Sequence, residues 1–371
     1  MEPIMGIISN TKCEELLKEL TLYRCMSAVP FGGRYRLIDF AMSNMVNSGI
    51  RNIGIITSHK YRSLMDHLGS GKEWGLDRKT EGLIILPPAS PSVFKKDLSF
   101  DLQDFEANLD YFEKSRQKYV LISGNNMICN LDYKEALHFH FENEAHVTLF
   151  YEEEKYAASN TSNLFFLDVK PDGRVAAIKK TPNKNANSKV FLEMAIMDKA
   201  LLIDLIRVAR VSGTWELVDV LLNNIDALKV CAYGVNRYVG KITSLESFYR
   251  CNMDLLNRET WDELFLESNP IYTKIKDGPP TKYAVEAEVT NSLIASGCNI
   301  AGKIDGSVLF RGVTIGRGAQ IKSSIIMQQS EIEDQVELEN VILDKEVHIR
   351  KGTVLKGKKK TPIVIGKRSI I

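Results

Sequence analysis

The sequence has no long hydrophobic run. No apolar stretch reaches the roughly 20 residues that a membrane-spanning helix requires. The N-terminus also lacks a basic region followed by an apolar one, which is the pattern of a secretory signal peptide. We therefore expect a cytoplasmic protein that does not bind membranes.

An excess of charge of either sign is also missing. The 48 Lys and Arg residues face 47 Asp and Glu residues, which leaves a net charge of +1 and excludes a bulk electrostatic attraction to nucleic acid. The six cysteines form no CxxC pair, so neither a zinc knuckle nor a disulfide framework is indicated: Cys13, Cys25, Cys129, Cys231, Cys251 and Cys298. A reducing compartment fits this pattern.

The most informative stretch that is present runs from Ala28 to Asn44 and has the sequence AVPFGGRYRLIDFAMSN. Two glycines break the chain, and Arg34 and Arg36 follow at the entry to a predicted helix that ends at Gly49. Glycines followed by paired arginines at a helix entry suit phosphate oxygens. The alternative is a tight turn with two solvated arginines.

Strand and helix patterns alternate through the first two-thirds of the chain, which is typical of a doubly wound α/β sheet. The predicted strands are residues 4–9, 50–57, 82–86 and 119–122, and the predicted helices include residues 13–22 and 105–116. His138 and His140 are two residues apart in a helix and share no face, so they do not predict a metal site.

The C-terminal part repeats. Val308, Ile325 and Ile342 follow one another at steps of 17 residues, and apolar residues fall about six apart within each turn. This spacing predicts a left-handed parallel β-helix of about four coils. Since 371 residues are too many for one core, we expect an α/β domain at 1–240, a helix and extended connector at 241–284, and the β-helix at 285–371.

Two features of the repeat have a functional and a structural interpretation. His348 is the only histidine in it, and we interpret it as a solvated residue rather than as the catalytic base of an acyltransferase. The basic tail either binds an anionic metabolite or forms a solvated face; it comprises Arg350, Lys351, Lys356, Lys358, Lys359 and Lys360.

The run from Ala28 to Asn44, with NSGI after it, closely resembles the signature of bacterial ADP-glucose pyrophosphorylases (glucose-1-phosphate adenylyltransferases), and the likeness is collinear over most of the chain. The resemblance implies a Rossmann-like nucleotidyltransferase domain, a C-terminal β-helix and assembly as tetramers. It also implies a reaction of ATP with glucose 1-phosphate that depends on Mg²⁺.

The chain departs from this family at the positions that carry the chemistry. The Gly-rich triphosphate loop is replaced by residues 10–13, which contain no glycine, and Glu14 and Glu15 follow them. Asn125 or Asn126 stands where the family has a metal-binding aspartate, and Lys241 stands at the second such position. A neutral amide and a cation are poor substitutes for ligands of a hard dication.

The family's sugar-phosphate contacts are also replaced. Met26 stands in place of a lysine, and Thr181 replaces the lysine of the V-E-K-P stretch. Glu193 falls at the glycine of the S-M-G stretch, and Trp215 puts a large indole at the D-F-G triplet. Together these departures resemble the non-catalytic, regulatory D-type subunit of the family. The chain is therefore expected to have no catalytic residues and no cofactor.

The alternative is an active, Mg²⁺-dependent glucose-1-phosphate adenylyltransferase, so enzymatic activity stays open at this point. Arg24, Arg34 and Arg36 are retained, and they are candidates for binding a sugar phosphate or phosphate effector. The resemblance also implies a partner, the catalytic subunit, in a mixed tetramer that serves glycogen synthesis. A homo-oligomer is expected when that partner is absent.

Overall fold

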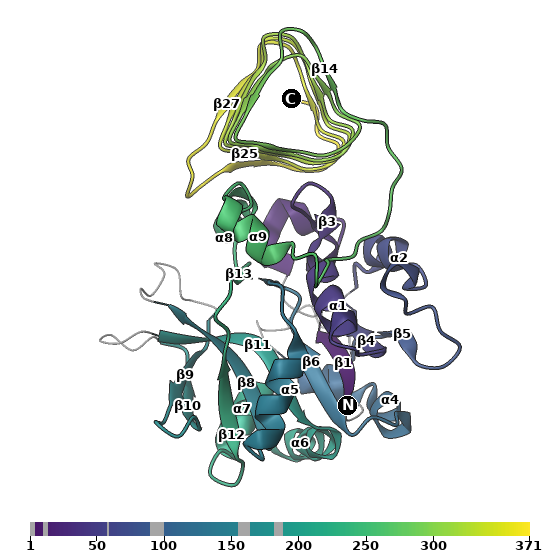
Figure 1. Ribbon diagram of the computed structural model, residues 1–371, viewed down its shortest axis with the longest axis vertical. Coiled ribbons are helices and arrows are strands. Elements are labelled where there is room, and N and C mark those ends of the chain that lie inside the picture. Colours follow the sequence, from purple (N-terminus) through teal and green to yellow (C-terminus); the bar gives the residue numbers. More distant parts are fainter. Residues whose placement is uncertain (1–3, 10–13, 58, 90–99, 155–163, 182–187) are drawn as a thin grey trace. The chain divides into compact units, whose positions relative to one another are not determined.

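The computed structural model describes residues 4–9, 14–57, 59–89, 100–154, 164–181 and 188–371 (Figure 1). The chain forms two compact units. The first comprises residues 1–13, 41–61 and 68–239, and the second comprises residues 14–40, 62–67 and 240–371. Segments from the N-terminal part thus belong to the unit that holds the C-terminal repeat. No helix in the described residues is long and apolar enough to cross a membrane.

The first unit is built on a nine-stranded mixed sheet. Its parallel part has the order β6-β1-β4-β5, and β11 joins β6 in the antiparallel direction. The strands are β1 (Ile4–Ser9), β4 (Asn52–Ile56), β5 (Gly82–Leu86), β6 (Tyr119–Ser123), β8 (Val147–Glu154), β9 (Phe166–Val169), β10 (Val175–Lys179), β11 (Ser188–Asp198) and β12 (Val230–Gly234). β1 and β4 are buried along their whole length, as expected of parallel strands with both faces covered.

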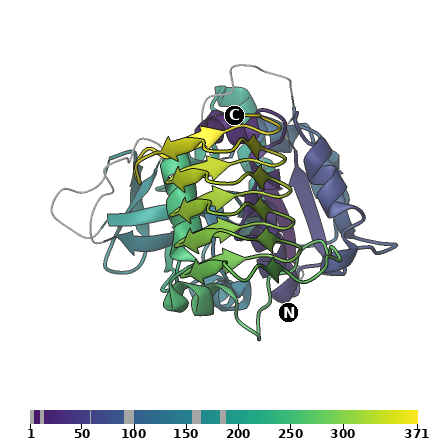
Figure 2. The same cartoon turned by 90° about the horizontal axis from the view of Figure 1, so that it is seen from above.

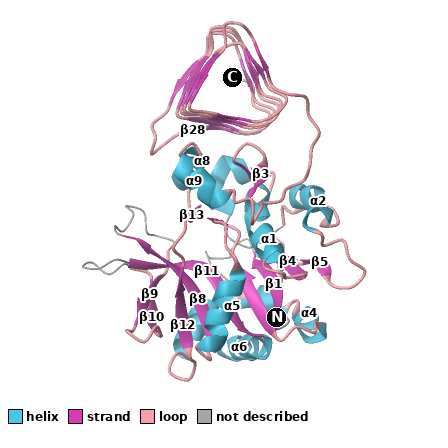
Figure 3. Ribbon diagram, viewed as in Figure 1, coloured by secondary structure: helices cyan, strands magenta, loops and turns pink. Residues whose placement is uncertain are grey.

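Helices cover this sheet (Figure 3). They are α3 (Leu102–Glu106), α4 (Leu109–Lys114), α5 (Tyr133–Glu142), α6 (Lys199–Ser212) and α7 (Leu217–Asn223). The first unit also contains the short 3₁₀ helix η3 (Lys72–Trp74) and the two-residue strand β7 (Met127–Ile128). One continuous core joins α3, α4, α6 and α7 to β1, β6, β8 and β11, and in it the rings of Phe105 and Phe112 stack with centroids 5.8 Å apart. α1 (Leu37–Asn47) and α2 (Arg62–Leu68) each have residues in both units.

Two sequence expectations for helices were wrong. The helix expected at 13–22 is a 3₁₀ helix, η1 (Glu14–Thr21), and Lys18 breaks it with non-helical angles of φ 40° and ψ −108°. The helix expected at 105–116 is split into α3 and α4, because the chain leaves the helix at Ala107 and Asn108, and α4 starts anew at Leu109. In both segments the apolar spacing was right, but it did not reveal the interruption.

The glycines and arginines of the stretch from Ala28 to Asn44 lie in a hairpin of the second unit. β2 (Pro30–Phe31) pairs with β3 (Tyr35–Arg36) in the antiparallel direction, directly before α1. Gly32 and Gly33 lie in the loop with φ of 55° and 79°, in the left-handed region that glycine adopts without strain. A second 3₁₀ turn, η2 (Met26–Ala28), precedes the hairpin.

The repeat of the second unit forms three parallel sheets of five strands each, a left-handed β-helix (Figure 2). It therefore has five coils rather than about four, because β14 starts the first coil at Lys282, before the region where the repeat is clear in sequence. The sheets are β14 (Lys282–Tyr283), β17 (Asn299–Ile300), β20 (Thr314–Ile315), β23 (Glu331–Ile332) and β26 (His348–Ile349); β15 (Glu288–Thr290), β18 (Lys303–Asp305), β21 (Gln320–Lys322), β24 (Glu337–Glu339) and β27 (Val354–Lys356); and β16 (Leu293–Ile294), β19 (Val308–Leu309), β22 (Ile325–Ile326), β25 (Val341–Leu343) and β28 (Ile363–Ile365).

The β-helix core is a stack of aliphatic side chains. Ile300, Ile315, Ile332 and Ile349 pair from one coil to the next, and each is at most 2% exposed. The same unit holds β13 (Gly240–Lys241), α8 (Leu245–Asp254) and α9 (Arg258–Leu264). Ser244 caps α8 by accepting a hydrogen bond from the Ser247 N–H, which fixes where this helix begins.

Candidate functional site

The loop after β6 holds Asn125 and Asn126, one of which the resemblance places at a metal-binding aspartate of the family. Asn125 and Asn126 are buried, at 1% and 0% exposure. The loop is anchored to β11, because the Gly124 N–H donates to the Glu193 carbonyl at 2.9 Å. Further along, Asn44 of α1 donates from Nδ2 to the Cys129 carbonyl at 3.0 Å and accepts from the Leu131 N–H at 3.2 Å. The position of the loop is thus fixed from both ends.

Glu193 is the residue in this region that sequence reasoning undervalued. Its backbone has φ of 53°, a conformation that favours glycine, yet its side chain is only 2% exposed. A Cβ placed on Gly124 would lie 3.1 Å from Glu193 Oε2 and 2.9 Å from Asn126 Oδ1. A carboxylate and an amide therefore fill the space beside Gly124. The positive φ of Glu193 agrees with the glycine that the resemblance places at this position. The replacement of that glycine by Glu193 was noted in the sequence.

The donor set of this loop does not fit Mg²⁺. Two amides stand beside a single carboxylate, and a hard dication held by charge needs more negative oxygen than that. Among the described residues, no group of three or more His, Cys, Asp or Glu side chains could hold a metal ion. Lys241 lies buried in β13 of the second unit, and its ammonium adds no ligand.

The segment around Trp215 has a structural role in the first unit. The Leu102 N–H donates to the Trp215 carbonyl at 2.8 Å, and the buried Glu216 carboxylate accepts from the Phe100 N–H at 3.3 Å. The Trp215 indole packs against the core of the sheet. Thr181 is exposed at the edge of the described residues.

Arginines 24 and 36 come together with two lysines in the second unit, and we call Arg24, Arg36, Lys276 and Lys345 the cationic cluster. Arg24 is 3% exposed and makes two 2.9 Å hydrogen bonds to the Asp344 carboxylate, one from each terminal nitrogen. Arg36 donates to the Ser63 hydroxyl at 3.0 Å. Lys345 follows Asp344 directly, at the corner after β25.

The positive charges of this cluster lie close enough to repel one another. Burial, together with the nearby charges of Arg36 and Arg24, lowers the pKa of Lys345 to about 7. Burial and repulsion from Arg36 likewise lower the pKa of Lys276. Burial also lowers the pKa of Arg36, although Asp39 opposes this shift. A bound anion would relieve the repulsion among these cations.

Asp39 contacts Arg36 of this cluster and the neighbouring His67. Its carboxylate accepts from the Arg36 N–H at 2.9 Å and lies 2.6 Å from His67 Nε2. Arg34, the third arginine predicted to bind an anion, is exposed and lies over the Tyr35 ring, 5.3 Å from its centroid. Burial lowers the pKa of Arg311, and the charge of Arg34 lowers it further. Sequence reasoning missed Lys276 and Lys345, and no sequence signal links them to the arginines.

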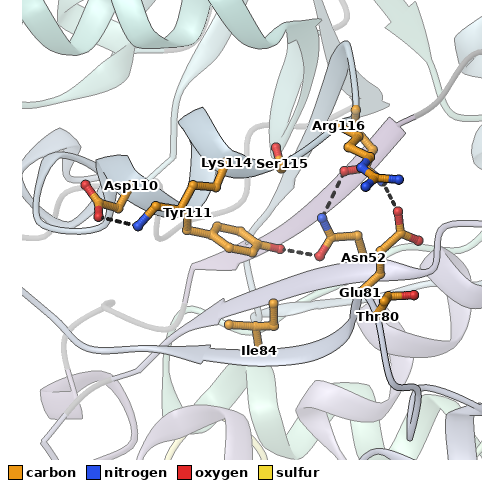
Figure 4. Close-up of a pocket in the computed structure, with 10 residues that line it drawn as sticks. Asn52, Thr80, Glu81, Ile84, Asp110, Tyr111, Lys114, Ser115 and Arg116 are labelled. Carbon is orange, nitrogen blue, oxygen red and sulfur yellow. Dashed lines mark hydrogen bonds and ion pairs between the residues drawn. The ribbon is translucent and has the colours of Figure 1, made fainter.

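The first unit has a pocket of about 560 Å³ where β4, β5 and β6 begin, whereas the Asn125 loop follows the end of β6 (Figure 4). Asn52, the first residue of β4, accepts from the Tyr111 hydroxyl at 2.8 Å and donates to Gln117 at 3.0 Å. Gln117 donates in turn to Glu81 at 2.7 Å. These groups bond to one another, so the network closes the end of the sheet.

Comparison with known proteins follows the same division of the chain. Residues 15–191 match the family model for nucleotidyl transferases, and residues 279–360 match the model for the GlmU-like C-terminal hexapeptide. The fold and these matches define a nucleotidyl transferase domain followed by a hexapeptide β-helix.

Relatives that match over most of their length identify the family more narrowly. The chain is 38% identical over 365 residues to the glycogen biosynthesis protein GlgD of Bacillus subtilis (strain 168), covering 98% of this chain and 96% of the relative. It is 41% identical over 318 residues to GlgD of Geobacillus stearothermophilus, covering 86% and 82%. It is 31% identical over 355 residues to the glucose-1-phosphate adenylyltransferase of Bacillus mycoides (strain KBAB4), covering 94% and 93%. The chain belongs to the family that the GlgD proteins and glucose-1-phosphate adenylyltransferases form.

Proposed function

We propose that this glycogen biosynthesis protein is a regulatory subunit of ADP-glucose pyrophosphorylase with little or no activity of its own. The observation that carries the proposal is the buried arrangement of Asn125, Asn126 and Glu193. Adenylyl transfer depends on stabilising negative charge on phosphates, usually through a metal ion. This loop offers amides in place of metal ligands, and its one carboxylate would repel a phosphate.

The first experiment tests for activity. The purified chain is incubated with ATP, Mg²⁺ and glucose 1-phosphate, and ADP-glucose is measured. We expect no turnover above a preparation of the same chain denatured by heat. The alternative, an active adenylyltransferase, is supported if turnover is robust and an Asn125→Ala/Asn126→Ala variant abolishes it.

The partner we propose is the catalytic subunit, in a mixed tetramer. The β-helix supports assembly, because among the described residues β14, β15 and β16 of its first coil each pair with a strand on one side only. The first coil also exposes Tyr283 and Val285, at 56% and 103%. Within the assembly, the chain would change the partner's turnover or substrate affinity by contacting two states of the partner unequally. Alone, the chain would form a homo-oligomer.

Co-expression tests the partnership. Both chains are produced together with a tag on only one, and the purified complex is sized and its kcat and KM compared with those of the catalytic subunit alone. Co-purification with a changed kcat or KM supports the proposal. Separate elution with unchanged kinetics contradicts it. Val285→Glu, a change at the exposed first coil, is the interface variant, and Val211→Glu, at an exposed position of α6 in the first unit, is its matched control.

We propose the cationic cluster as the effector site, with phosphate or a sugar phosphate as ligand. The charges of Arg36, Arg24 and Lys276 all act on Lys345, and Arg24 already pairs with Asp344, so Arg36, Lys276 and Lys345 are the groups that would hold the ligand. Calorimetric titration with glucose 1-phosphate and with inorganic phosphate tests the site. Arg36→Ala should weaken binding, whereas Arg258→Ala, on the exposed face of α9, should not.

A further inference from the structure

A second pocket in the second unit lies apart from the cationic cluster. It has a volume of about 350 Å³, and it lies between α8, one corner of the β-helix and the loop that joins β27 to β28. Four of its lining residues share one face of α8 at helical spacing: Glu246, Tyr249, Arg250 and Met253. Two residues of the basic tail, Lys359 and Lys360, also line it.

The loop over the pocket is an insertion into the repeat. Ile325 pairs with Ile342 at the usual step of 17 residues, but Val341 pairs with Ile363 at a step of 22. The extra residues form a tight turn, because Lys358 and Thr361 exchange backbone hydrogen bonds of 3.2 and 2.9 Å. Figure 1 shows this loop projecting from the yellow last coil on the side of α8. Its tip carries Lys359 and Lys360.

Space for a ligand arises from one glycine in the corner of the β-helix. Asn291, Gly306, Ser323 and Asn340 occupy the same corner in successive coils, all with φ between 44° and 56°. Gly306 alone of these four has no side chain, and a Cβ there would meet only Ser323 Oγ, at 3.7 Å. The missing side chain leaves the wall of the pocket open at this coil.

The charges around the pocket are mostly positive. Arg250, Lys359 and Lys360 face a single carboxylate, that of Glu246. None of these three cations forms an ion pair with another residue in the described part of the chain. Tyr249 is held in place, because its hydroxyl donates to the Ser323 carbonyl at 2.6 Å. The Tyr249 ring, Met253 and Leu256 supply the apolar wall.

We propose that this pocket binds an organic phosphate that carries a flat apolar group. The lysines of the insertion and Arg250 would hold the phosphate, because they are exposed at the rim and form no ion pair with another described residue. The apolar group would lie against Tyr249 and Met253, and Gly306 gives it room. The volume is within the range of small-molecule sites. The pocket offers both cations for a phosphate and an apolar wall for a ring, whereas the cationic cluster offers positive charge alone.

The probe for this proposal is 1-naphthyl phosphate, titrated calorimetrically into the full-length chain, with inorganic phosphate and 1-naphthol as the two partial probes. We expect saturable binding of 1-naphthyl phosphate at least tenfold tighter than of either partial probe. Binding should weaken with added salt, since the lysines are exposed. Equal affinity for inorganic phosphate, or no saturation, overturns the proposal.

Variants locate the binding. The double change Lys359→Gln/Lys360→Gln should raise the Kd at least tenfold, while Lys358→Gln in the same loop should leave it within twofold. Gly306→Asn should also raise the Kd, and the fold tolerates asparagine at this corner because Asn291 and Asn340 already occupy it. Arg36→Ala should have no effect. A Kd that responds to Arg36→Ala and not to the loop lysines places the probe in the cationic cluster and refutes this site.

Discussion

Lys345 gives the sharpest prediction about the cationic cluster, because its pKa of about 7 places its charge change within the range of ordinary assays. An anion binds best when Lys345 is protonated, so affinity should fall as the pH rises through that pKa. Sulfate is the suitable probe, since its own charge does not change between pH 6 and pH 9. His67, which faces Asp39 and Arg36, has a pKa lowered by burial.

The size of the effect follows from the pKa. If only the protonated form binds strongly, the apparent Kd rises by about tenfold for one pH unit above the pKa, or about 1.4 kcal/mol. We therefore expect sulfate affinity to drop about tenfold between pH 6 and pH 8, measured by calorimetry at constant ionic strength.

Lys345→Arg is the control, because its guanidinium stays protonated and its sulfate affinity should be flat from pH 6 to pH 8. Lys345→Met should bind sulfate weakly at every pH. A flat profile for the unchanged protein would refute the reasoning, as would a profile that persists in Lys345→Arg. The same pKa shift makes a prediction for folding. The unfolded chain takes up the proton more readily between pH 7 and 10.5, so this group's effect on stability becomes more favourable as the pH rises through that window.

Three further predictions concern particular side chains. Arg24→Met leaves the Asp344 carboxylate buried without its bidentate partner, and should lower the free energy of unfolding by about 3–5 kcal/mol in urea titrations; a loss below 1 kcal/mol would contradict the buried pair. Gly82→Ala should unfold at lower urea, because φ there is 88° and a Cβ would meet the Leu76 carbonyl at 2.3 Å; an unchanged midpoint would show that the strand relaxes. Glu193→Gly should raise the affinity for glucose 1-phosphate, measured by calorimetry, since it empties the space beside Gly124; the idea fails if Glu193→Gln, which keeps the volume, binds equally well.

Local patterns in the sequence were sufficient for much of the fold. The strands at 50–57, 82–86 and 119–122 and the helix after Arg36 were predicted correctly, because burial on both faces or on one helix face leaves a continuous or periodic apolar pattern. The coiled repeat was predicted from its 17-residue step for the same reason. The start of the first coil was missed, because β14 precedes residue 285 and the exposed Tyr283 and Val285 do not keep the apolar pattern of a buried coil.

The candidate site depended on both levels. The replacements at Asn125 or Asn126 and at Lys241 are predictions from the sequence alone, which rest on the residue-by-residue resemblance to the family. Asn125 and Asn126 lie in the first unit and Lys241 lies in the second, so a joint effect of the three on metal binding stays a prediction.

Only the tertiary structure brought Lys345 to Arg24, and Gly306 to the loop of Lys359. These pairs are far apart in the chain, and their proximity results from packing of the second unit, with the Arg24–Asp344 pair as one of its contacts. A sequence pattern reports the burial of neighbours within a few residues. Charge repulsion and cavity space depend on distances between side chains from remote segments, and those distances are fixed only when the coils, α8 and the hairpin pack together.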